Sequence, residues 1–496
     1  MKVISTRNKK EEMPALDAVL KGIAADGGLF VPLDFPCLDL NGIVKTASKG
    51  YPALASEVLS AYIDLSKEEL EILAAEAYAS FDTKEVVPLS CVDNACVMEL
   101  WHGPTLAFKD MALQVLPRLL QKAMARQTDG RKVLILTATS GDTGKAAMDG
   151  FADVDGTAIV VFYPSEGVSD MQKLQMVTQE GGNVCACAVH GNFDDAQNGV
   201  KELFANPDFN RQMRQAGYDL SSANSINFGR LVPQVAYYVY AYAKLVLEEK
   251  IKCGSPINVV VPTGNFGNIL AAYYAKQMGL PIRRLVCASN RNNVLTDFFH
   301  KGEYTARRTF YKTMSPSMDI LISSNLERLL FELCGRDEAQ VSAWMAALKK
   351  EGRYEVPAAV VDKMQRDFWA GYCDDGRTGE TIKQVYGEYG YLLDTHTAVA
   401  WAVYEDYKKV TGEDIPTVIA STANPFKFVP DVLRSLTGEE TGDDIFGAAQ
   451  KLAEVSKSAV PDKITELKTK PVLHHGAVKK SGLADVIIKF VEAQNG

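Results

Sequence analysis

Long hydrophobic runs and an excess of positive charge are both missing from this sequence. Its longest apolar stretches, such as VLILTA and INVVVP, have the length of a strand and fall far below the roughly 20 residues of a membrane-spanning helix. The chain has 53 basic and 62 acidic residues and a net charge of −9, so it offers no basic field to a phosphate backbone. We therefore expect neither a membrane-spanning protein nor a nucleic-acid-binding protein.

Cysteine is also used sparsely. Nine cysteines are scattered through the chain, an odd number without the regular spacing of a disulfide framework. Cys185 and Cys187 are the only pair close in sequence; two apart on a strand they point to one face, which favours core packing over metal binding. We predict no metal site.

The N-terminus MKVISTRNKKEEMPALDAVL lacks the apolar core of a secretory signal, which predicts a cytoplasmic protein.

What the sequence does contain is a regular alternation. With 496 residues, 47% of them hydrophobic, the chain can form more than one domain and a large core. Short β-branched runs alternate with amphipathic helical stretches, which is typical of α/β proteins whose parallel sheets are covered by helices on both faces. The runs lie at residues 132–138, 157–163, 183–189, 257–262, 283–289 and 417–422.

Breaks in this alternation suggest three parts. Residues 1–95 read as a separate, mainly helical unit. Residues 96–250 and 251–496 are predicted to form a smaller and a larger α/β subdomain. Within the larger one, residues 301–391 contain helix-like stretches such as EAQVSAWMAALKKEG and are predicted to be a helical insertion.

Ligands of open α/β sheets bind at the carboxyl ends of the strands. After the first run comes TATSGDTGKAA, in which Thr139, Ser140, Gly141, Asp142 and Thr143 lead into a helix. Amides and hydroxyls there would converge on an anion at the positive end of the helix dipole.

A nucleotide P-loop is excluded for this segment, because Thr139 stands where its first glycine belongs and Ala146 where it needs Ser or Thr. The alternative is a plain turn with a helix N-cap.

Two further loops have a similar position. In PTGNFGN the residues from Gly264 to Asn268 join a strand to a helix, and such a loop can approach a phosphate closely with its backbone. The alternative is a tight turn with an asparagine in the left-handed conformation. In STANPFKF a strand ends at the hydroxyls of Ser421 and Thr422; they face a ligand or cap a turn.

Lys109 is the one lysine in the otherwise small, apolar or hydroxyl-bearing stretch LWHGPTLAFKDMALQ. Apolar surroundings disfavour an ammonium ion and so make a lysine amine nucleophilic toward aldehydes. The alternative is a lysine at a helix start that pairs with Asp110 or reaches water. A reactive lysine together with a phosphate-binding loop indicates pyridoxal 5′-phosphate, which needs both attachments.

Six motifs, HGPTLAFKD, TATSGDTG, NSINFGRLVPQ, PTGNFGN, SPSMDI and STANPFKF, occur in this order, and with them the chain resembles the threonine synthases, which are pyridoxal-phosphate enzymes of fold type II, the tryptophan-synthase-β-like group. The resemblance covers nearly the whole chain and includes STRN and ADGGLFVP near its start. It implies Lys109 as the Schiff-base lysine and Thr422 opposite the pyridine nitrogen. The implied ligands of the cofactor phosphate are Gly264, Asn265, Phe266, Gly267 and Asn268.

The resemblance also implies a reaction and a substrate site. O-phospho-L-homoserine and water would give L-threonine and phosphate by β,γ-replacement, the last step of threonine biosynthesis, with Lys109 moving protons. The substrate carboxylate would lie at the loop of Thr139, Ser140, Asp142 and Thr143. Candidate ligands of the substrate phosphate are Asn224, Ser225, Asn227 and Arg230.

Two alternatives stay open: a threonine or serine dehydratase with the same cofactor residues, and a non-catalytic binding protein on the same scaffold. The sequence predicts no oligomeric state.

Overall fold

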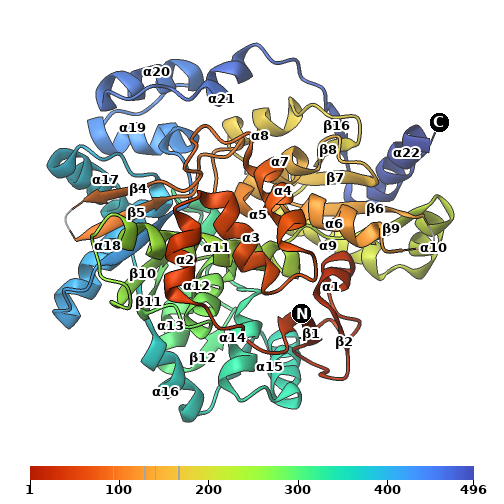
Figure 1. Cartoon of the computed structure of the whole chain (residues 1–496). Coiled ribbons are helices and arrows are strands. Elements are labelled where there is room, and N and C mark those ends of the chain that lie inside the picture. The colour runs from red at the N-terminus through yellow and green to blue at the C-terminus, as the bar shows by residue number, and fades with distance from the viewer. Residues whose placement is uncertain (93, 128–129, 140, 166–167, 496) are drawn as a thin grey trace.

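Two sheets, one of six strands and one of five, form the framework of the chain. The computed structural model describes residues 1–92, 94–127, 130–139, 141–165 and 168–495. The sheets lie side by side, and the N-terminal helices cross in front of them in the view of Figure 1.

The smaller sheet is parallel throughout. Its strands in spatial order are β16 (Gly476–Val478), β8 (Val184–Val189), β7 (Thr157–Pro164), β6 (Lys132–Ala138) and β9 (Tyr218–Ser221). One face is covered by α6 (Leu116–Met124), α7 (Asp142–Phe151) and α8 (Asp170–Val177). The other is covered by α9 (Phe193–Ala205), α10 (Pro207–Gln215) and α22 (Leu483–Asn495). Both faces of each strand are therefore apolar.

The larger sheet has one antiparallel edge strand, β4, and is otherwise parallel. Its order is β14 (Phe368–Tyr372), β11 (Ile282–Ser289), β10 (Ile257–Pro262), β15 (Thr417–Ser421), β5 (Ala95–Glu99) and β4 (Leu89–Val92). Helices α11 (Phe228–Leu247), α12 (Gly267–Gln277) and α13 (Val294–Lys301) cover one face. Helices α17 (Asp375–Tyr389), α18 (Thr395–Thr411) and α19 (Val429–Thr437) cover the other.

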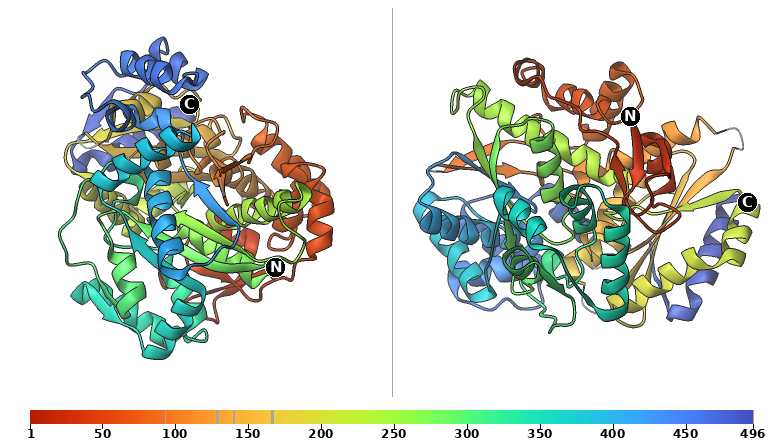
Figure 2. Two further views of the ribbon diagram at one scale, coloured as in Figure 1. Left: turned by 90° about the vertical axis from the view of Figure 1, so that its left-hand side faces the viewer. Right: turned by 90° about the horizontal axis from the view of Figure 1, so that it is seen from below.

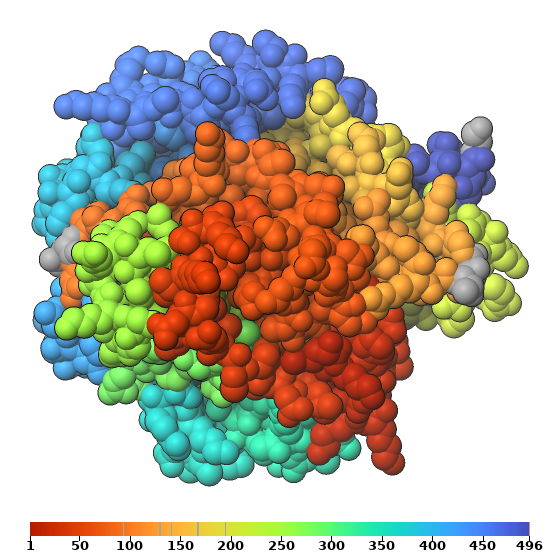
Figure 3. All heavy atoms as spheres, viewed as in Figure 1, coloured from red at the N-terminus to blue at the C-terminus, as the bar shows by residue number. Residues whose placement is uncertain are grey.

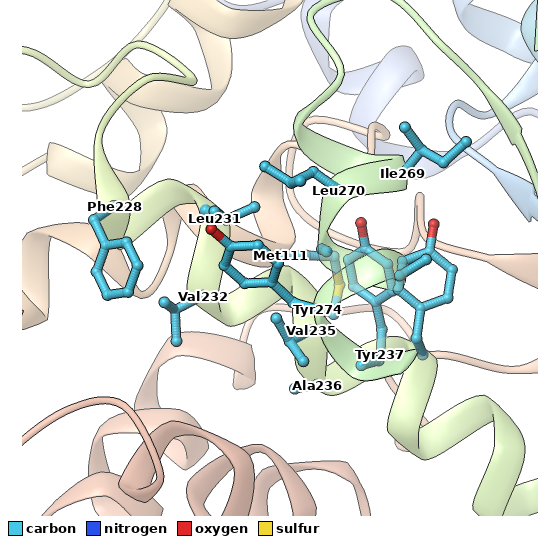
Figure 4. Packing of buried hydrophobic residues seen from close by; sticks show 14 of the residues in the cluster. Met111, Phe228, Leu231, Val232, Val235, Ala236, Tyr237, Ile269, Leu270 and Tyr274 are labelled. Atoms are coloured by element: carbon cyan, nitrogen blue, oxygen red, sulfur yellow. The ribbon is translucent and has the colours of Figure 1, made fainter. Parts of the chain in front are cut away.

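All six apolar runs picked out in the sequence are strands of these sheets, so the predicted α/β class is confirmed. The large core between the sheets is built mainly on α11, whose residues are buried along nearly its whole length. Figure 4 shows its packing, in which the labelled residues come from α5 (Asp110–Leu113), α11 and α12: Met111, Phe228, Leu231, Val232, Val235, Ala236, Tyr237, Ile269, Leu270 and Tyr274.

The N-terminal unit is not purely helical. It contains an antiparallel sheet of β2 (Glu12–Pro14), β1 (Lys2–Ser5) and β3 (Phe30–Pro32). Its helices are α1 (Ala15–Lys21), α2 (Leu40–Ala47), α3 (Tyr51–Ser60) and α4 (Lys67–Tyr78). In Figure 3 these residues, red and orange, cover the centre of the visible face.

The predicted insertion is mixed rather than helical, and its last two elements belong to the larger sheet: β14 is the edge strand, and α17 covers one of the faces. Its other elements are β12 (Glu303–Thr305), η1 (Pro316–Met318), α14 (Leu326–Leu333), α15 (Glu338–Glu351), β13 (Arg353–Glu355) and α16 (Ala358–Asp367). In the left view of Figure 2 the elements from β12 to α16 lie at the end of the molecule opposite the blue C-terminal helices.

Strand pairing crosses the predicted subdomain boundaries, since β4 precedes residue 96 yet extends the larger sheet, and β16 lies beyond residue 250 yet joins the smaller one. The remaining C-terminal elements are η2 (Pro425–Phe428), α20 (Ile445–Ser456), α21 (Asp462–Thr465), η3 (Glu466–Lys468) and η4 (Lys480–Gly482). The three-part division stays a prediction.

Cysteines behave only partly as expected. Cys187 is buried and Cys185 packs against the same core cluster, as predicted. However, Cys91 and Cys96 are disulfide-bonded across the β4–β5 hairpin, where they face each other in register. The prediction that Cys185 and Cys187 are the only close pair was wrong, because hairpin register brings together residues five apart. Among the described residues no helix has the length and apolar character needed to span a membrane.

Candidate active site

Lys109 lies directly before α5, in a segment that runs beside the end of β15. Leu106 has a left-handed φ of 59°, and Ala107 forms an isolated bridge with Ala423. Phe108 donates its backbone N–H to the carbonyl oxygen of Thr422 at 2.9 Å. The backbone thus fixes Lys109 next to Thr422 before any ligand is considered.

The side-chain amine of Lys109 is largely buried, with 11% of the side chain exposed. Its Nζ atom lies 3.5 Å from Oδ2 of Asp142, 3.4 Å from the hydroxyl of Ser317 and 4.8 Å from the ring centroid of Phe108. Burial lowers the pKa of this amine, and the nearby cations Lys427 and Arg230 act in the same direction, while Asp142 partly opposes them. A lysine in this state loses its proton more easily than an exposed one.

Hydrogen bonds within the loop after β6 fix its conformation. The hydroxyl of Thr139 donates to the carbonyl of Gly141 and accepts the N–H groups of Gly141 and Gly144 at 3.0 and 2.9 Å. That hydroxyl is therefore committed to the turn and not available to a substrate. Ser140 lies outside the described residues. Thr143 is half-buried, and in the described structure its hydroxyl has no protein partner.

The contacts of the Asp142 side chain disagree with the prediction that it binds the substrate carboxylate. Its carboxylate accepts from Lys427 Nζ at 2.7 Å, from Gln172 Nε2 at 2.9 Å and from the Ser317 hydroxyl at 3.3 Å. Burial by itself would raise the pKa of this carboxyl, but the Lys427 and Lys109 cations hold the pKa well below its usual range. A carboxylate would repel a second one, so the Asp142 side chain cannot hold the substrate carboxylate.

The backbone amides at the start of α7 remain available to bind the substrate carboxylate. Asp142 and Thr143 occupy the first turn of α7, where N–H groups have no carbonyl one turn earlier within the helix. Such amides bind carboxylates and phosphates well. The backbone amides at this helix start and the Thr143 hydroxyl are the groups left to bind an anion here, and the anion site itself stays a prediction.

The loop from Gly264 to Asn268 is shaped by a different part of the chain. A Cβ atom on Gly264 would come within 2.6 Å of the Ser317 carbonyl oxygen, so any other residue there would force the backbone of the loop or of Ser317 to move. Ser323 donates its hydroxyl to the Gly264 carbonyl at 2.7 Å, and the side chain of Asn325 donates to the Asn265 carbonyl at 3.0 Å. The left-handed residue of the turn is Phe266, with φ 65°, and not an asparagine.

This loop offers donors to an anion. Gly267 and Asn268 begin α12, and their amides lie in its first turn. The side-chain oxygen of Asn268 accepts from the Tyr238 hydroxyl, while its Nδ2 atom is buried and lacks a partner within the described part of the chain. A buried amide donor without a partner is costly, and a phosphate in the loop would satisfy it.

Thr422 directly follows β15 and has a buried side chain. Its neighbour Ser421 is committed, since the Ser421 hydroxyl accepts from Trp101 Nε1 and from the Thr397 hydroxyl, both at 3.0 Å. The Thr422 hydroxyl has no such partner among the residues described. The amine of Lys109, the donors of the loop before α12 and this hydroxyl have the chemistry that the aldehyde, phosphate and ring nitrogen of pyridoxal phosphate require.

Of the four predicted ligands of a substrate phosphate, Asn227 has to be removed. Its Nδ2 atom donates to the carbonyls of Val19 and Ser222, and its Oδ1 atom accepts from Gly229 N as the N-cap of α11. No donor is left for a ligand. Asn224 and Ser225 are half-buried, and their side chains have no hydrogen bond within the described structure.

Arg230 differs from the other deeply buried arginine, Arg328. The guanidinium of Arg328 has all three nitrogens bonded, to the carbonyls of Phe30 and Ile226 and to the side chain of Asn325. In Arg230, Nη1 donates to the Ala223 carbonyl, and Nε is buried without a partner. Burial lowers the pKa of both arginines to about 10. No carboxylate pairs with Arg230 in the described residues, so its guanidinium is available to bind an anion.

Sequence reasoning missed Lys427 and Ser317 as members of the site. Both lie in quoted motifs, STANPFKF and SPSMDI, but nothing in those motifs shows that the two side chains meet at Asp142. A search of the described part of the chain finds no cluster of three or more His, Cys, Asp or Glu side chains placed to hold a metal ion.

Comparisons with known proteins agree with this geometry. A family model described as "Threonine synthase N terminus" matches residues 2–78, and one described as "Pyridoxal-phosphate dependent enzyme" matches residues 89–358. The solved structure of PLP-bound threonine synthase from Brucella melitensis superposes with a TM-score of 0.86 at 35% identity, covering 100% of both chains.

Two curated relatives extend the comparison. Threonine synthase from Pseudomonas aeruginosa is 38% identical over 445 residues, which is 88% of this chain and 91% of the relative. Human threonine synthase-like 1 is 40% identical over 440 residues, 86% of this chain but 58% of the relative. The chain thus spans less than two thirds of the length of the latter protein.

The fold and the three cofactor-compatible groups place the chain among the pyridoxal-phosphate-dependent enzymes of fold type II. This confirms the predicted fold type and cofactor. Within that class the chain belongs to the threonine synthase family.

Proposed function

We propose that the protein is a threonine synthase, a carbon–oxygen lyase that converts O-phospho-L-homoserine and water to L-threonine and phosphate. Arg230 is the observation that carries this proposal. It is a buried guanidinium whose Nε has no partner in the described residues, and it is one of the cations that lower the pKa of the Lys109 amine. A dianionic phosphate would pair with this guanidinium, whereas a substrate without phosphate would leave the guanidinium unpaired at a cost.

The cofactor residues follow from the same site. Lys109 would hold the aldehyde carbon, Gly264 to Asn268 the phosphate, and Thr422 the ring nitrogen. When bound, pyridoxal phosphate withdraws electrons from the substrate carbons and so makes their protons acidic. In the loop from Gly264 to Asn268, the Nδ2 atom of Asn268, which has no partner in the described residues, would donate to the cofactor phosphate. Gly264 would allow the loop to lie close to the backbone of Ser317.

Each remaining residue then has a defined task. The amine of Lys109, with its pKa lowered by burial, would take and return protons at the substrate carbons. The amides at the start of α7 and the Thr143 hydroxyl would hold the substrate carboxylate. Arg230, Asn224 and Ser225 would hold the substrate phosphate until it leaves from Cγ. The deep burial of Arg230 strengthens the electrostatic interaction of its guanidinium with the substrate phosphate.

Other parts of the assignment rest on the sequence. We propose a small-molecule substrate, and a cytoplasmic location remains a prediction from the N-terminus. The division into residues 1–95, 96–250 and 251–496 is likewise proposed, with the active site where the two sheets meet.

The test is turnover by the purified, cofactor-loaded chain. Incubation with O-phospho-L-homoserine should release L-threonine and inorganic phosphate in equal amounts. Release of 2-oxobutanoate from L-threonine without any reaction of phosphohomoserine would identify a dehydratase instead. If neither substrate reacts while the cofactor is retained, a binding protein on this scaffold is favoured.

A further inference from the structure

Lys427 lies at the junction between the two sheets. It belongs to η2, which follows β15 of the larger sheet, and its side chain is fully buried. Its Nζ atom donates to Oδ1 of Asp142 at 2.7 Å and to the carbonyl of Thr105 at 2.8 Å. Asp142 opens α7, which follows β6 of the smaller sheet. The ion pair therefore joins the two halves of the site.

The two oxygens of Asp142 have different partners. Oδ1 has the short contacts, to Lys427 and to Gln172 Nε2. Oδ2 has the long ones, 3.5 Å to Lys109 Nζ and 3.3 Å to the Ser317 hydroxyl. A buried carboxylate needs a cation, and without Lys427 the nearest cation would be Lys109.

We propose that Lys427 is a positioning residue: by holding the Asp142 carboxylate it prevents Lys109 from being drawn into a tight ion pair and so keeps the Lys109 amine free to react. Asp142 then serves as the spacer between two lysines, with Lys427 as its permanent partner. The proposal rests on the proposed function only in taking Lys109 as the reactive lysine, and it does not depend on the substrate.

The charged groups that face Lys109 come from three elements: Asp142 from α7, Arg230 from α11 and Lys427 from η2. Ser317 of η1 adds a neutral hydroxyl. Both cations lower the pKa of the Lys109 amine and Asp142 raises it. Loss of Lys427 removes one cation and also frees the carboxylate to approach, so both effects act to protonate Lys109.

The experiment measures Lys109 itself in the full chain after the cofactor has been removed. Cyanate, which reacts with neutral amines, is applied between about pH 6 and pH 10, and carbamylation of Lys109 is followed by peptide mass spectrometry. Wild type is compared with Lys427→Met, Asp142→Asn and the double variant. Lys145→Met is the matched control, since Lys145 is another buried lysine, paired with Asp149 at 3.4 Å on the same helix as Asp142.

We expect the midpoint of Lys109 labelling to rise by about one pH unit in Lys427→Met, which is about tenfold slower labelling at a pH below the midpoint. It should fall in Asp142→Asn, return toward wild type in the double variant, and stay unchanged in Lys145→Met. A Lys427→Met protein with a lower melting temperature and the wild-type midpoint would show a merely structural salt bridge and overturn the proposal.

If Lys427→Met does not fold, the comparison of Lys427→Arg with Lys427→Gln decides. Lys427→Arg keeps a cation beside the Asp142 carboxylate and should keep the midpoint near that of wild type, whereas Lys427→Gln keeps a hydrogen-bond donor without the charge and should raise the midpoint. Equal midpoints in these two variants would also overturn the proposal. Because no substrate is present, failure here is distinct from failure of the proposed reaction.

Discussion

Two glycine-rich loops leave the carboxyl ends of parallel strands, one after β6 and one after β10, and they are fixed in different ways. The loop after β6 is held from within by the Thr139 hydroxyl, and its first helical residue, Asp142, is paired with lysines. The loop after β10 is held from outside by Ser317, Ser323 and Asn325.

The charges of the two loops differ as well. A carboxylate and two ammonium groups meet at the first loop. The second loop contains the neutral side-chain amide of Asn268, whose Nδ2 atom has no partner among the described residues. A loop with paired charges suits a place where protons move, while a neutral loop with free donors suits a phosphate that stays bound. Similar sequence patterns can therefore form sites with different tasks.

Replacement of Lys109, which lies next to Asp142 of the loop after β6, should have the largest effect on turnover. Lys109→Ala should reduce turnover of O-phospho-L-homoserine on the order of 10³-fold or more, because it removes the amine that moves the protons in the proposed reaction. The melting temperature should stay close to that of wild type, since Asp142 keeps Lys427 as its cation. Steady-state kinetics and thermal unfolding test this, and near-normal turnover would remove Lys109 from the reaction.

The second loop can be tested by comparing its two glycines. In Gly264→Ala the new methyl group meets the Ser317 carbonyl oxygen at 2.6 Å, whereas in Gly267→Ala its nearest neighbours are 3.5 and 3.7 Å away. Overpacking of this kind costs about 1–3 kcal/mol. Gly264→Ala should therefore bind pyridoxal phosphate roughly tenfold or more weakly, and Gly267→Ala nearly as well as wild type. Equal affinities in an absorbance titration would contradict this account of the loop.

The first loop has its own matched pair, Thr139 and Thr143. Thr139→Val leaves the N–H groups of Gly141 and Gly144 without their acceptor, so the free energy of unfolding should fall by about 1–3 kcal/mol. Thr143→Val should leave stability unchanged and raise KM for the substrate. Urea unfolding and kinetics of both variants distinguish the two roles; similar stability losses would show that Thr143 is structural too.

A smaller effect, on the pH dependence of stability, is expected from His102 in the segment that leads to Lys109. His102 lies between Asp82 and Glu99; burial lowers the pKa of its ring, but hydrogen bonds to these carboxylates raise it overall to about 9. Because the pKa is higher in the folded state than its ordinary value near 6.5, the stabilisation is full below about pH 6.5 and is lost as pH rises through 9.

Thermal unfolding of wild type and His102→Gln tests this. The wild-type protein should be the more stable below neutral pH, and the difference should shrink by pH 10. A difference that does not change with pH would mean that His102 stays neutral in the folded protein.

Sequence patterns predicted what depends on neighbours along the chain. The six apolar runs became strands because helices cover both faces of each sheet, and the loops after β6 and β10 lie where strand–glycine–helix patterns placed them. What the patterns could not show are partners far apart in sequence. Lys427 and Asp142 are 285 residues apart (427 − 142) and meet only because β15 and β6 end at the same junction.

The same limit explains the errors. Asn227 has the residue type of a phosphate ligand, but its position at the start of α11 makes it an N-cap. Strands β1 to β3 are short and lack the β-branched runs of the large sheets, so their pairing left no clear periodic signal. Asp142 looked like an anion-loop residue because its lysine partner was not visible.

The central claim, that Arg230 binds the phosphate of the substrate and not a structural carboxylate, is tested most directly in Arg230→Leu. The cofactor-loaded variant is titrated with O-phospho-L-homoserine and, separately, with phosphate-free L-threonine, each followed by cofactor absorbance. Loss of a charge-assisted contact of about 1.5–3 kcal/mol predicts roughly 10- to 150-fold weaker binding of the phosphorylated ligand and little change for threonine. Equal losses for the two ligands would contradict the account.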